Sequence, residues 1–186
     1  SNSIKNNVPT LLGKVVGVYS LFHRGANKTT KQDVMVIENL FYNREVTKIF
    51  DLKGSLRSRY VLNPSPDVVL LDMNLLQLMS TAPFYVTDEM KATLSVAIQN
   101  DTQFLASVSV MDYSLLVGKD SETGELVVGI IDYVRKYTWD KQLETWVKSS
   151  YIVQRGKAEI PTIISPKQYR IRFQDAMWVY FVMVPN

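Results

Sequence analysis

The sequence of 186 residues predicts a single α+β domain, or a large piece of one, in which antiparallel strands and a few helices share a core. Three observations support this prediction. Two pairs of β-rich segments flank short polar turns, as in β-hairpins. Two segments begin with a capping residue and continue with apolar residues at helical spacing. Hydrophobic residues make up 46% and charged residues 21% of the chain, which is typical of globular proteins.

The first elements in the chain are strands. Residues 11–22 and the segment from residue 33 to residue 40 are β-rich and flank a polar turn, which predicts an antiparallel hairpin. Residues 47–52 form another short strand that ends at Lys53-Gly54-Ser55. After a proline-containing loop, residues 67–71 read as a short extended run.

Three helices follow from capping signals and apolar spacing. Residues 71–80 predict a short helix. Thr87 is the candidate N-cap of the second, and Ser165 with Pro166 at the first helical position begins the last. The apolar stripe of the second helix is Met90, Leu94, Ala97, Ile98 and Leu105, and that of the last is Tyr169, Phe173, Ala176, Met177, Tyr180, Phe181 and Val184.

A second hairpin, formed by residues 113–119 and 125–131, carries the first candidate site. If its turn centres near Glu122, Asp112 and Asp132 lie opposite each other at the open end. Their β-carbons would be roughly 5 Å apart, and two carboxylates that close repel unless a cation or a proton lies between them. Mg²⁺ prefers carboxylate and phosphate oxygens together. One acid could therefore bind the metal while the other orients or deprotonates an attacking hydroxyl, as in phosphoryl transfer.

The alternative is that both acids only end strands and face water. Two details favour the functional interpretation. Each acid follows an apolar stretch, and each precedes a tyrosine, in Met111-Asp112-Tyr113 and Ile131-Asp132-Tyr133. An ordinary polar turn would have neither feature.

Lys53, followed by Gly54 and Ser55, is the second candidate. A lysine beside a glycine can approach a phosphate closely, because glycine allows backbone contact. The alternative is a solvated lysine at the end of a strand. The short string Lys-Gly-Ser is too common to decide between the two.

Positive charge is concentrated in one segment. Residues 133–172 carry nine basic and three acidic side chains, a net charge of +6, whereas the whole chain has +3. Trp139, Trp146 and Tyr151 alternate with these charges, and such a stretch could dock on an anionic bilayer. The alternatives are a solvated surface, or nucleic-acid binding, against which the absence of a recognised nucleic-acid motif argues.

Composition excludes several classes of protein. The chain has no cysteine, which excludes a disulfide framework, a thiolate zinc site and a cysteine nucleophile. Its only histidine, His23, is assigned no role. It has no run of eighteen apolar residues, so a transmembrane helix is not predicted.

Taken together, the motifs resemble those of the phosphatidylinositol phosphate kinases. Residues 50–57 are similar to the DLKGS motif of that family, residues 110–118 to its MDYSLL motif and residues 129–133 to its metal-binding IID motif. All three occur in the family's order. From about residue 11 onward, the sequence most resembles the branch of phosphatidylinositol 3-phosphate 5-kinases, as in Thr138-Trp139-Asp140-Lys141.

The resemblance implies an α+β, protein-kinase-like fold with ATP bound between two lobes. Residues 1–45 would be the end of the small lobe and the hinge, and residues 46–186 the large lobe. An activation loop at about residues 133–164 would select the lipid and contact the membrane. The implied site residues are Glu38, Asn39 and Leu40 facing adenine, Lys53 near the nucleotide phosphates, Asp112 as catalytic acid near the 5-hydroxyl, Asp132 as Mg²⁺ ligand and second catalytic acid, and Lys141, Lys148, Arg155 and Lys157 toward substrate and membrane.

The sequence departs from the family pattern in two respects. The glycine-rich phosphate loop and the strand lysine that grips ATP have no counterpart here, and no Gly-x-Gly occurs. Lys141 stands alone where relatives often have a pair of lysines, which weakens the expected membrane contact. We therefore expect an incomplete kinase domain that does not transfer phosphate by itself.

The implied activity is the ATP- and Mg²⁺-dependent phosphorylation of phosphatidylinositol 3-phosphate on its 5-hydroxyl, giving the 3,5-bisphosphate. The implied location is the cytoplasmic face of endosomal or vacuolar membranes, with a scaffold protein and an opposing phosphoinositide phosphatase as partners and no nucleic acid. The alternative is a non-catalytic phosphoinositide-binding module with a decayed nucleotide site. The missing glycine loop favours this alternative, whereas Lys53 and the two acids argue against it.

Overall fold

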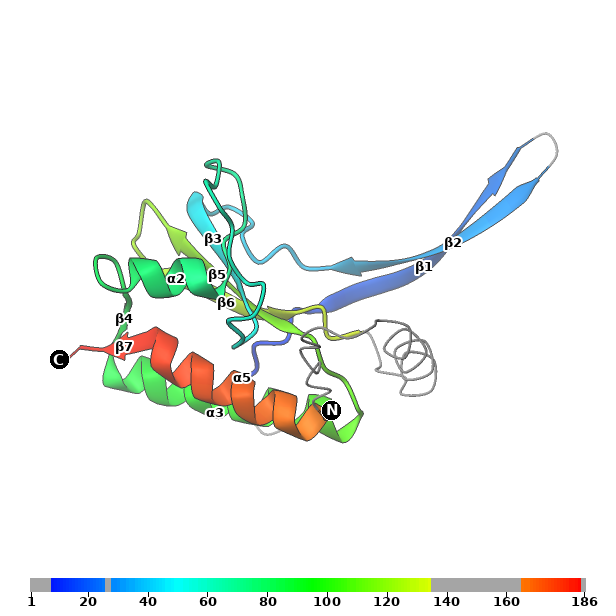
Figure 1. Ribbon diagram of the computed structural model, residues 1–186. Helices are drawn as coiled ribbons and strands as arrows, with labels where there is room; N and C mark the ends of the chain where they lie inside the picture. The colour runs from blue at the N-terminus through cyan, green and yellow to red at the C-terminus, as the bar shows by residue number, and fades with distance from the viewer. Residues whose placement is uncertain (1–7, 26–27, 135–164, 185–186) are drawn as a thin grey trace, which may run out of the picture.

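A computed structural model describes residues 8–25, 28–134 and 165–184 (Figure 1). Its strands form three sheets: β1 (Val15–Arg24) with β2 (Thr29–Ile37), β3 (Val46–Leu52) with β5 (Ser114–Asp120) and β6 (Leu126–Ile131), and β4 (Phe84–Val86) with β7 (Phe181–Met183). Its helices are α2 (Asp72–Leu78), α3 (Asp88–Ser107) and α5 (Pro166–Tyr180). The described residues thus have the mixed α/β composition that the sequence predicts.

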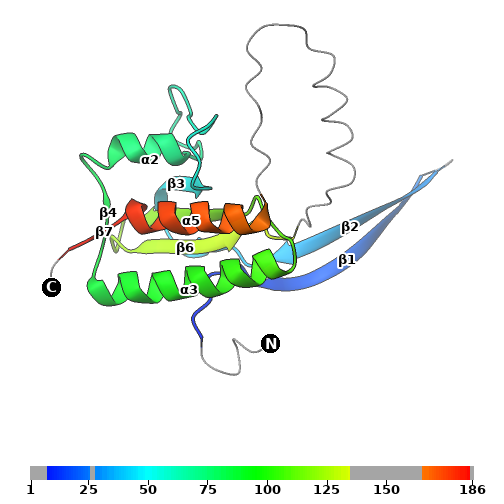
Figure 2. The same cartoon turned by 60° about the horizontal axis from the view of Figure 1, so that its bottom comes forward.

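The three-stranded sheet is the centre of the molecule. β5 lies between β3 and β6, and both neighbours are antiparallel to it. Helices α3 and α5 lie side by side along this sheet and run in opposite directions (Figures 1 and 2). The sheet and the two helices therefore enclose the core between them.

The core is continuous from the sheet to the helices. It includes Phe50, Leu52, Leu75, Ile98, Leu105, Tyr113, Leu115, Val117, Ile130, Tyr169, Phe173 and Met177. Most of β5 is buried, including the neighbours Ser114 and Leu115, and only Lys119 is exposed, as expected of the central strand of a covered sheet. Among the described residues, no helix combines the length and the apolar character needed to cross a membrane.

The first hairpin, β1–β2, extends away from this core (Figure 1). It confirms the predicted antiparallel pairing, with Tyr19 opposite Val34, and its strands run further into the turn than the sequence suggested. Its large apolar side chains are exposed: Val15, Val16, Val18, Tyr19, Leu21, Phe22, Val36 and Ile37. The hairpin thus contributes little to the core.

The segment that leads into the hairpin is bonded to the large sheet. Gly13 donates to the Ile130 carbonyl at 3.0 Å, and Ile130 donates to the Leu11 carbonyl at 2.6 Å. The carboxylate of Asp101 on α3 accepts from the Thr10 hydroxyl at 2.8 Å and from the Leu11 N–H at 2.6 Å. Residues 10–13 therefore pack on β6 and α3, although the division into lobes at residue 45 stays a prediction.

The predicted helix starts are confirmed. The Thr87 hydroxyl accepts from the Met90 N–H at the start of α3, and Ser165 and Gln168 form a reciprocal capping box at the start of α5. Met90, the first residue of the predicted apolar stripe, is exposed in the first turn of α3.

The end of the last helix and the extended run at residues 67–71 differ from the sequence prediction. α5 ends at Tyr180, and Phe181 begins β7, which pairs in parallel with Phe84 of β4. The rings of Phe84 and Phe181 lie 5.6 Å apart in the core, so this packing favours a strand where the apolar spacing alone predicted helix. Residues 67–71 are mostly turn and coil, with Leu70 forming a single bridge to Phe50.

Candidate functional site

Three predicted site residues meet in one pocket, which we call the acid pocket. Its volume is about 330 Å³ and it is lined by Lys53, Met111, Asp112, Asp132 and Val134. Lys53 follows β3, Asp112 precedes β5 and Asp132 follows β6. Because these adjacent strands are antiparallel, the three residues lie at the same end of the central sheet. Lys53 Nζ lies 3.1 Å from Asp112 Oδ1.

The predicted register of the second hairpin is wrong by one residue. Ser114 pairs with Ile131, so Asp112 and Asp132 are not directly opposite each other. Both acids have left-handed backbone, with φ of 68° and 61°, which aspartate tolerates better than most residues. The two strands stop pairing at this point, and the acids meet by lining the same pocket rather than as a cross-strand pair.

The side chains of Lys53 and Asp112 differ in their exposure to solvent. The Lys53 side chain is 19% exposed, whereas the Asp112 side chain is 70% exposed. The lysine is therefore held by its surroundings while the Asp112 carboxylate stays open to an incoming group. Tyr113, the residue after Asp112, is fixed by α5. The Tyr169 hydroxyl donates a hydrogen bond to the Tyr113 carbonyl, and the two rings pack edge to face at 4.8 Å.

A buried carboxylate organises the loop that carries Lys53. Asp72, the first residue of α2, is fully buried and accepts from the backbone N–H groups of Lys53 at 3.2 Å and Gly54 at 2.8 Å. On the other side of the loop, Arg172 of α5 donates to the Lys53 carbonyl at 3.3 Å. The backbone on both sides of the lysine is thus fixed.

Arg59 and Tyr180 complete the shell around Asp72. Arg59 Nε donates to Asp72 at 2.9 Å, and Arg59 also bonds to the carboxylate and carbonyl of Asp51. The Tyr180 hydroxyl donates to Asp72 at 3.0 Å. Burial lowers the pKa of the Arg59 guanidinium, but its hydrogen bonds to Asp51 and Asp72 outweigh burial and raise that pKa above its ordinary value.

Sequence reasoning missed Asp72, Arg59 and Tyr180. Asp72 follows the apolar run of residues 68–71 and opens a helix, so its charge looks like an ordinary first-turn acid. Its burial could have been suspected because apolar residues flank it on both sides. Its partners lie far away in the sequence, and no local pattern indicates them.

Gly54 is required by both conformation and packing. Its φ is 65°, and a β-carbon there would lie 2.9 Å from the Ala176 β-carbon and 3.0 Å from the Arg172 carbonyl. We expect Gly54→Ala to destabilise the protein by about 2 kcal/mol or more, since a left-handed alanine alone costs about 1–2 kcal/mol. Urea unfolding measures this loss.

Gly124→Ala is the matched control for Gly54→Ala. Gly124 has φ of 73° and open space around its missing β-carbon, so its substitution reports the backbone cost alone. A Gly54→Ala loss no larger than that of Gly124→Ala would contradict the close contact with α5.

The predicted hinge residues lie between the first hairpin and β3. Glu38 accepts from the Lys14 N–H at 2.7 Å, and Asn39 accepts from the Phe41 N–H at 3.0 Å. Leu40 packs on Gly129 of β6, where a β-carbon would lie 2.4 Å from Leu40 Cδ1. None of the three is among the described residues that line the acid pocket, and their role toward adenine stays a prediction.

The remaining predicted residues, Lys141, Lys148, Arg155 and Lys157, lie outside the described part of the chain. The same holds for most of the predicted activation loop.

The carboxylates that line the acid pocket fit a magnesium ion that takes its remaining ligands from elsewhere. Within the described ranges, no three His, Cys, Asp or Glu side chains form a self-sufficient metal cluster. Mg²⁺ often binds one or two carboxylates and completes its shell with water and substrate phosphates. Asp132, with Asp112 in the same pocket, supplies that donor set.

Comparison with known sequences agrees with these motifs. The family profile described as phosphatidylinositol-4-phosphate 5-kinase matches residues 1–126 and 119–179. A putative 1-phosphatidylinositol-3-phosphate 5-kinase of Arabidopsis thaliana is 57% identical over 99% of the chain, and the human 1-phosphatidylinositol 3-phosphate 5-kinase is 48% identical over all of it. The chain spans only 11% and 9% of these two proteins.

A more distant relative carries the same activity in its name. The 1-phosphatidylinositol 3-phosphate 5-kinase of Saccharomyces cerevisiae is 44% identical over 97% of the chain, which spans 8% of that protein. The profile covers nearly the whole chain and includes Lys53, Asp112 and Asp132. The chain therefore belongs to the phosphatidylinositol-4-phosphate 5-kinase family.

Proposed function

We propose that this chain is the catalytic part of a lipid kinase that transfers the γ-phosphoryl group of ATP to the 5-hydroxyl of phosphatidylinositol 3-phosphate. The observation that carries the proposal is the meeting of Lys53, Asp112 and Asp132 in the acid pocket. The activity for which the plant, human and yeast relatives are named supports the choice of lipid. A protein-kinase-like arrangement, with residues 1–45 in the small lobe and residues 46–186 in the large lobe, belongs to the same proposal.

Each charged residue of the acid pocket has a separate role in the proposed reaction. Asp112 is the open carboxylate, so it receives the proton of the 5-hydroxyl as that oxygen bonds to the γ-phosphorus and the bond to the β-phosphate oxygen breaks. The backbone of Lys53 is held by Asp72 and Arg172, and its side chain presents its charge to the phosphates. Asp132 would hold Mg²⁺, which neutralises phosphate charge when bound.

The lipid specificity is tested with the full-length protein. It is incubated with labelled Mg-ATP and vesicles that contain each phosphatidylinositol monophosphate separately. We expect label on the 3-phosphate lipid alone, giving the 3,5-bisphosphate. Label on another monophosphate, or on none, would refute the proposed substrate. The isolated chain is expected to transfer no label.

A nucleotide titration separates the kinase from the non-catalytic phosphoinositide-binding module. The kinase binds ATP in a magnesium-dependent way. Absence of binding at millimolar ATP in the full-length protein would favour the module.

The location and partners are part of the proposal. A kinase for this lipid is expected on the cytoplasmic face of endosomal or vacuolar membranes, with a scaffold protein and an opposing phosphatase. The resemblance of the motifs supports these assignments. Fractionation of intact cells and co-purification with the full-length protein test them.

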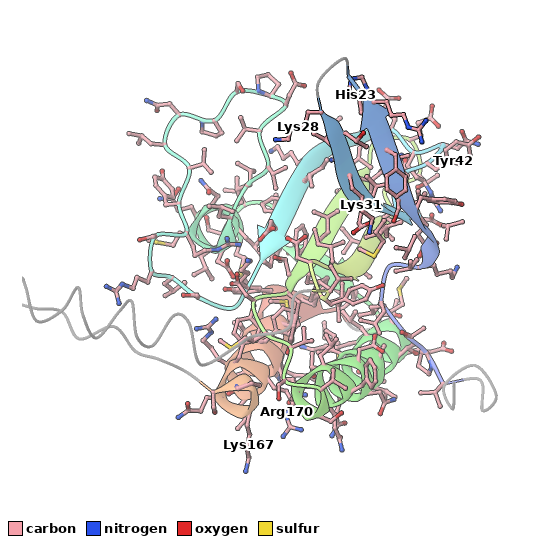
Figure 3. The ribbon with its side chains drawn as sticks, turned by 90° about the vertical axis from the view of Figure 1, so that its right-hand side faces the viewer. His23, Lys28, Lys31, Tyr42, Lys167 and Arg170 are labelled. Atoms are coloured by element: carbon pink, nitrogen blue, oxygen red, sulfur yellow. The ribbon has the colours of Figure 1, made fainter. Side chains whose placement is uncertain are left out.

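Charge reversal in the basic segment should affect the membrane-bound substrate and not the nucleotide. We expect Lys148→Glu, Arg155→Glu and Lys157→Glu together to lower turnover on vesicles by at least about tenfold, because each basic residue near an anionic surface is worth about 1 kcal/mol. The KM for ATP should stay unchanged. The matched control reverses Arg24 at the end of β1 together with Lys28 and Lys31, which Figure 3 labels on the first hairpin. Equal losses in both triple variants would contradict a specific role for the segment.

A further inference from the structure

A second pocket lies at the other end of the central sheet from Lys53. Its volume is about 660 Å³, and it is bordered by the start of β3, the turn of the second hairpin and the connection from α2 to β4. Lys48, Lys119, Thr47, Phe50 and Phe84 are among its lining residues. We call it the lysine pocket. It shares no lining residue with the acid pocket.

A β-bulge brings the two lysines together. Val46 pairs with Asp120, but the next pair joins Lys48 to Lys119, so Thr47 is the extra residue in β3. In a regular ladder without the bulge, Thr47 would pair with Lys119, and Lys48 would point to the other side of the sheet. Bulges commonly re-aim a side chain in this way. The local backbone thus places two like charges directly opposite each other.

Opposed like charges on neighbouring strands are destabilising. No hydrogen bond or ion pair of either ammonium group occurs within the described part of the chain, and both residues are exposed. Asp120 also lines the pocket, but its buried carboxylate accepts from the N–H groups of Glu122 and Thr123 and pairs with Arg44 at 3.3 Å. These donors hold the pKa of Asp120 below its usual range, the Thr123 N–H contributing most. The Asp120 carboxylate thus already has its own partners and does not pair with Lys48 or Lys119.

The remaining walls define the ligand more closely. The Thr47 hydroxyl has no hydrogen-bond partner among the described residues and can donate to an anion. Phe50 and Phe84 pack edge to face at 5.2 Å, and Leu126 adds apolar surface. A phosphomonoester carries a charge of about −1.5 to −2 at neutral pH and three acceptor oxygens, which matches two lysines and a hydroxyl. Apolar walls beside them suit the carbon body that bears the phosphate.

We propose that the lysine pocket binds a phosphomonoester group, separate from the acid pocket. Lys48 and Lys119 hold the phosphate between them, and its charge removes their mutual repulsion. The site does not depend on the proposed kinase activity. It is therefore present or absent whether or not the acid pocket transfers phosphate.

Hydrogen exchange in the full-length protein tests the site locally. The probes are inorganic phosphate, a soluble inositol monophosphate, and phosphatidylcholine vesicles with or without phosphatidylinositol 3-phosphate. At a probe concentration ten times its Kd, we expect exchange in peptides covering residues 44–50 and 117–124 to slow about tenfold. Protection by the soluble probes indicates a free phosphomonoester, and protection by the lipid vesicles alone indicates a membrane headgroup. No protection by any probe would overturn the proposal.

Two controls exclude charge screening and the acid pocket. Sodium acetate at matched ionic strength should give no protection, and protection equal to that of phosphate would mean screening only and overturn the site. Lys53→Met removes the nearest cation of the acid pocket and should leave the local protection unchanged. Loss of protection in Lys53→Met would assign the effect to the acid pocket instead.

The decisive variants have opposite effects on stability and binding. Lys48→Met with Lys119→Met should abolish the protection, whereas Lys28→Met with Lys167→Met should preserve it, since these lysines lie on the first hairpin and on α5 (Figure 3). Lys119→Glu should raise the thermal midpoint at low salt and abolish binding, because an opposite-charge pair replaces the repulsion. Retained protection in the double Lys48 and Lys119 variant would overturn the proposal.

Discussion

Asp72→Asn is expected to destabilise the protein by about 3 kcal/mol or more. The Asp72 side chain is fully buried and accepts from Lys53, Gly54, Arg59 and Tyr180. An asparagine keeps one acceptor oxygen but turns an amino group toward these donors and leaves Arg59 with one carboxylate partner. Removing one member of a buried ion pair costs about 3–5 kcal/mol. Such a loss is a large part of the 5–15 kcal/mol that stabilises a typical domain.

Urea unfolding monitored by tryptophan fluorescence measures the loss in the free energy of unfolding, and two variants serve as controls. Asp67→Asn removes an exposed carboxylate five residues earlier and should change the free energy of unfolding by less than about 0.5 kcal/mol. Tyr180→Phe removes one donor to Asp72 and should cost about 1 kcal/mol. An Asp72→Asn loss as small as that of Asp67→Asn would show that the carboxylate does not hold the loop.

Asp132→Asn in the full-length protein is expected to lower kcat by more than about 100-fold. Substitutions of groups that merely orient metal ligands cost 10–100-fold, so loss of a ligand carboxylate should cost more. Asp132 directly follows β6, has left-handed backbone and lines the acid pocket, and asparagine tolerates the same conformation. The substitution therefore removes charge without disturbing the fold.

The assay measures label transfer from Mg-ATP to phosphatidylinositol 3-phosphate in vesicles, with the thermal midpoint recorded for each variant. Glu122→Gln in the turn at the far end of the same hairpin is the matched control and should retain full turnover. Turnover of the Asp132→Asn variant within threefold of the parent, a margin of about 0.7 kcal/mol, would remove Asp132 from the metal site.

Local patterns predicted most of the strands and helices. The hairpins follow from polar turns between β-rich runs, and the starts of α3 and α5 follow from Thr87 and Ser165. Features that depend on distant residues were missed. β4 and β7 have three residues each and pair across nearly a hundred positions, so neither has a recognisable pattern alone.

The site was predicted in its residues but not in its geometry. The motifs pointed to Lys53, Asp112 and Asp132, and all three line one pocket. The register estimate placed the turn centre at Glu122, whereas observed pairs such as Ser114 with Ile131 centre half a residue later, between Glu122 and Thr123. This small difference moves every cross-strand partner by one residue.

The attachment of the first hairpin has a mechanical consequence. Its two ends are joined by the hydrogen bonds between Lys14 and Glu38, and both rest on the last three residues of β6, through Gly13 on Ile130 and Leu40 on Gly129. Both ends of the hairpin are therefore anchored on β6, the strand that directly precedes Asp132. Because Asp132 directly follows β6, a displacement of the hairpin would be transmitted to the strand that positions a residue of the acid pocket.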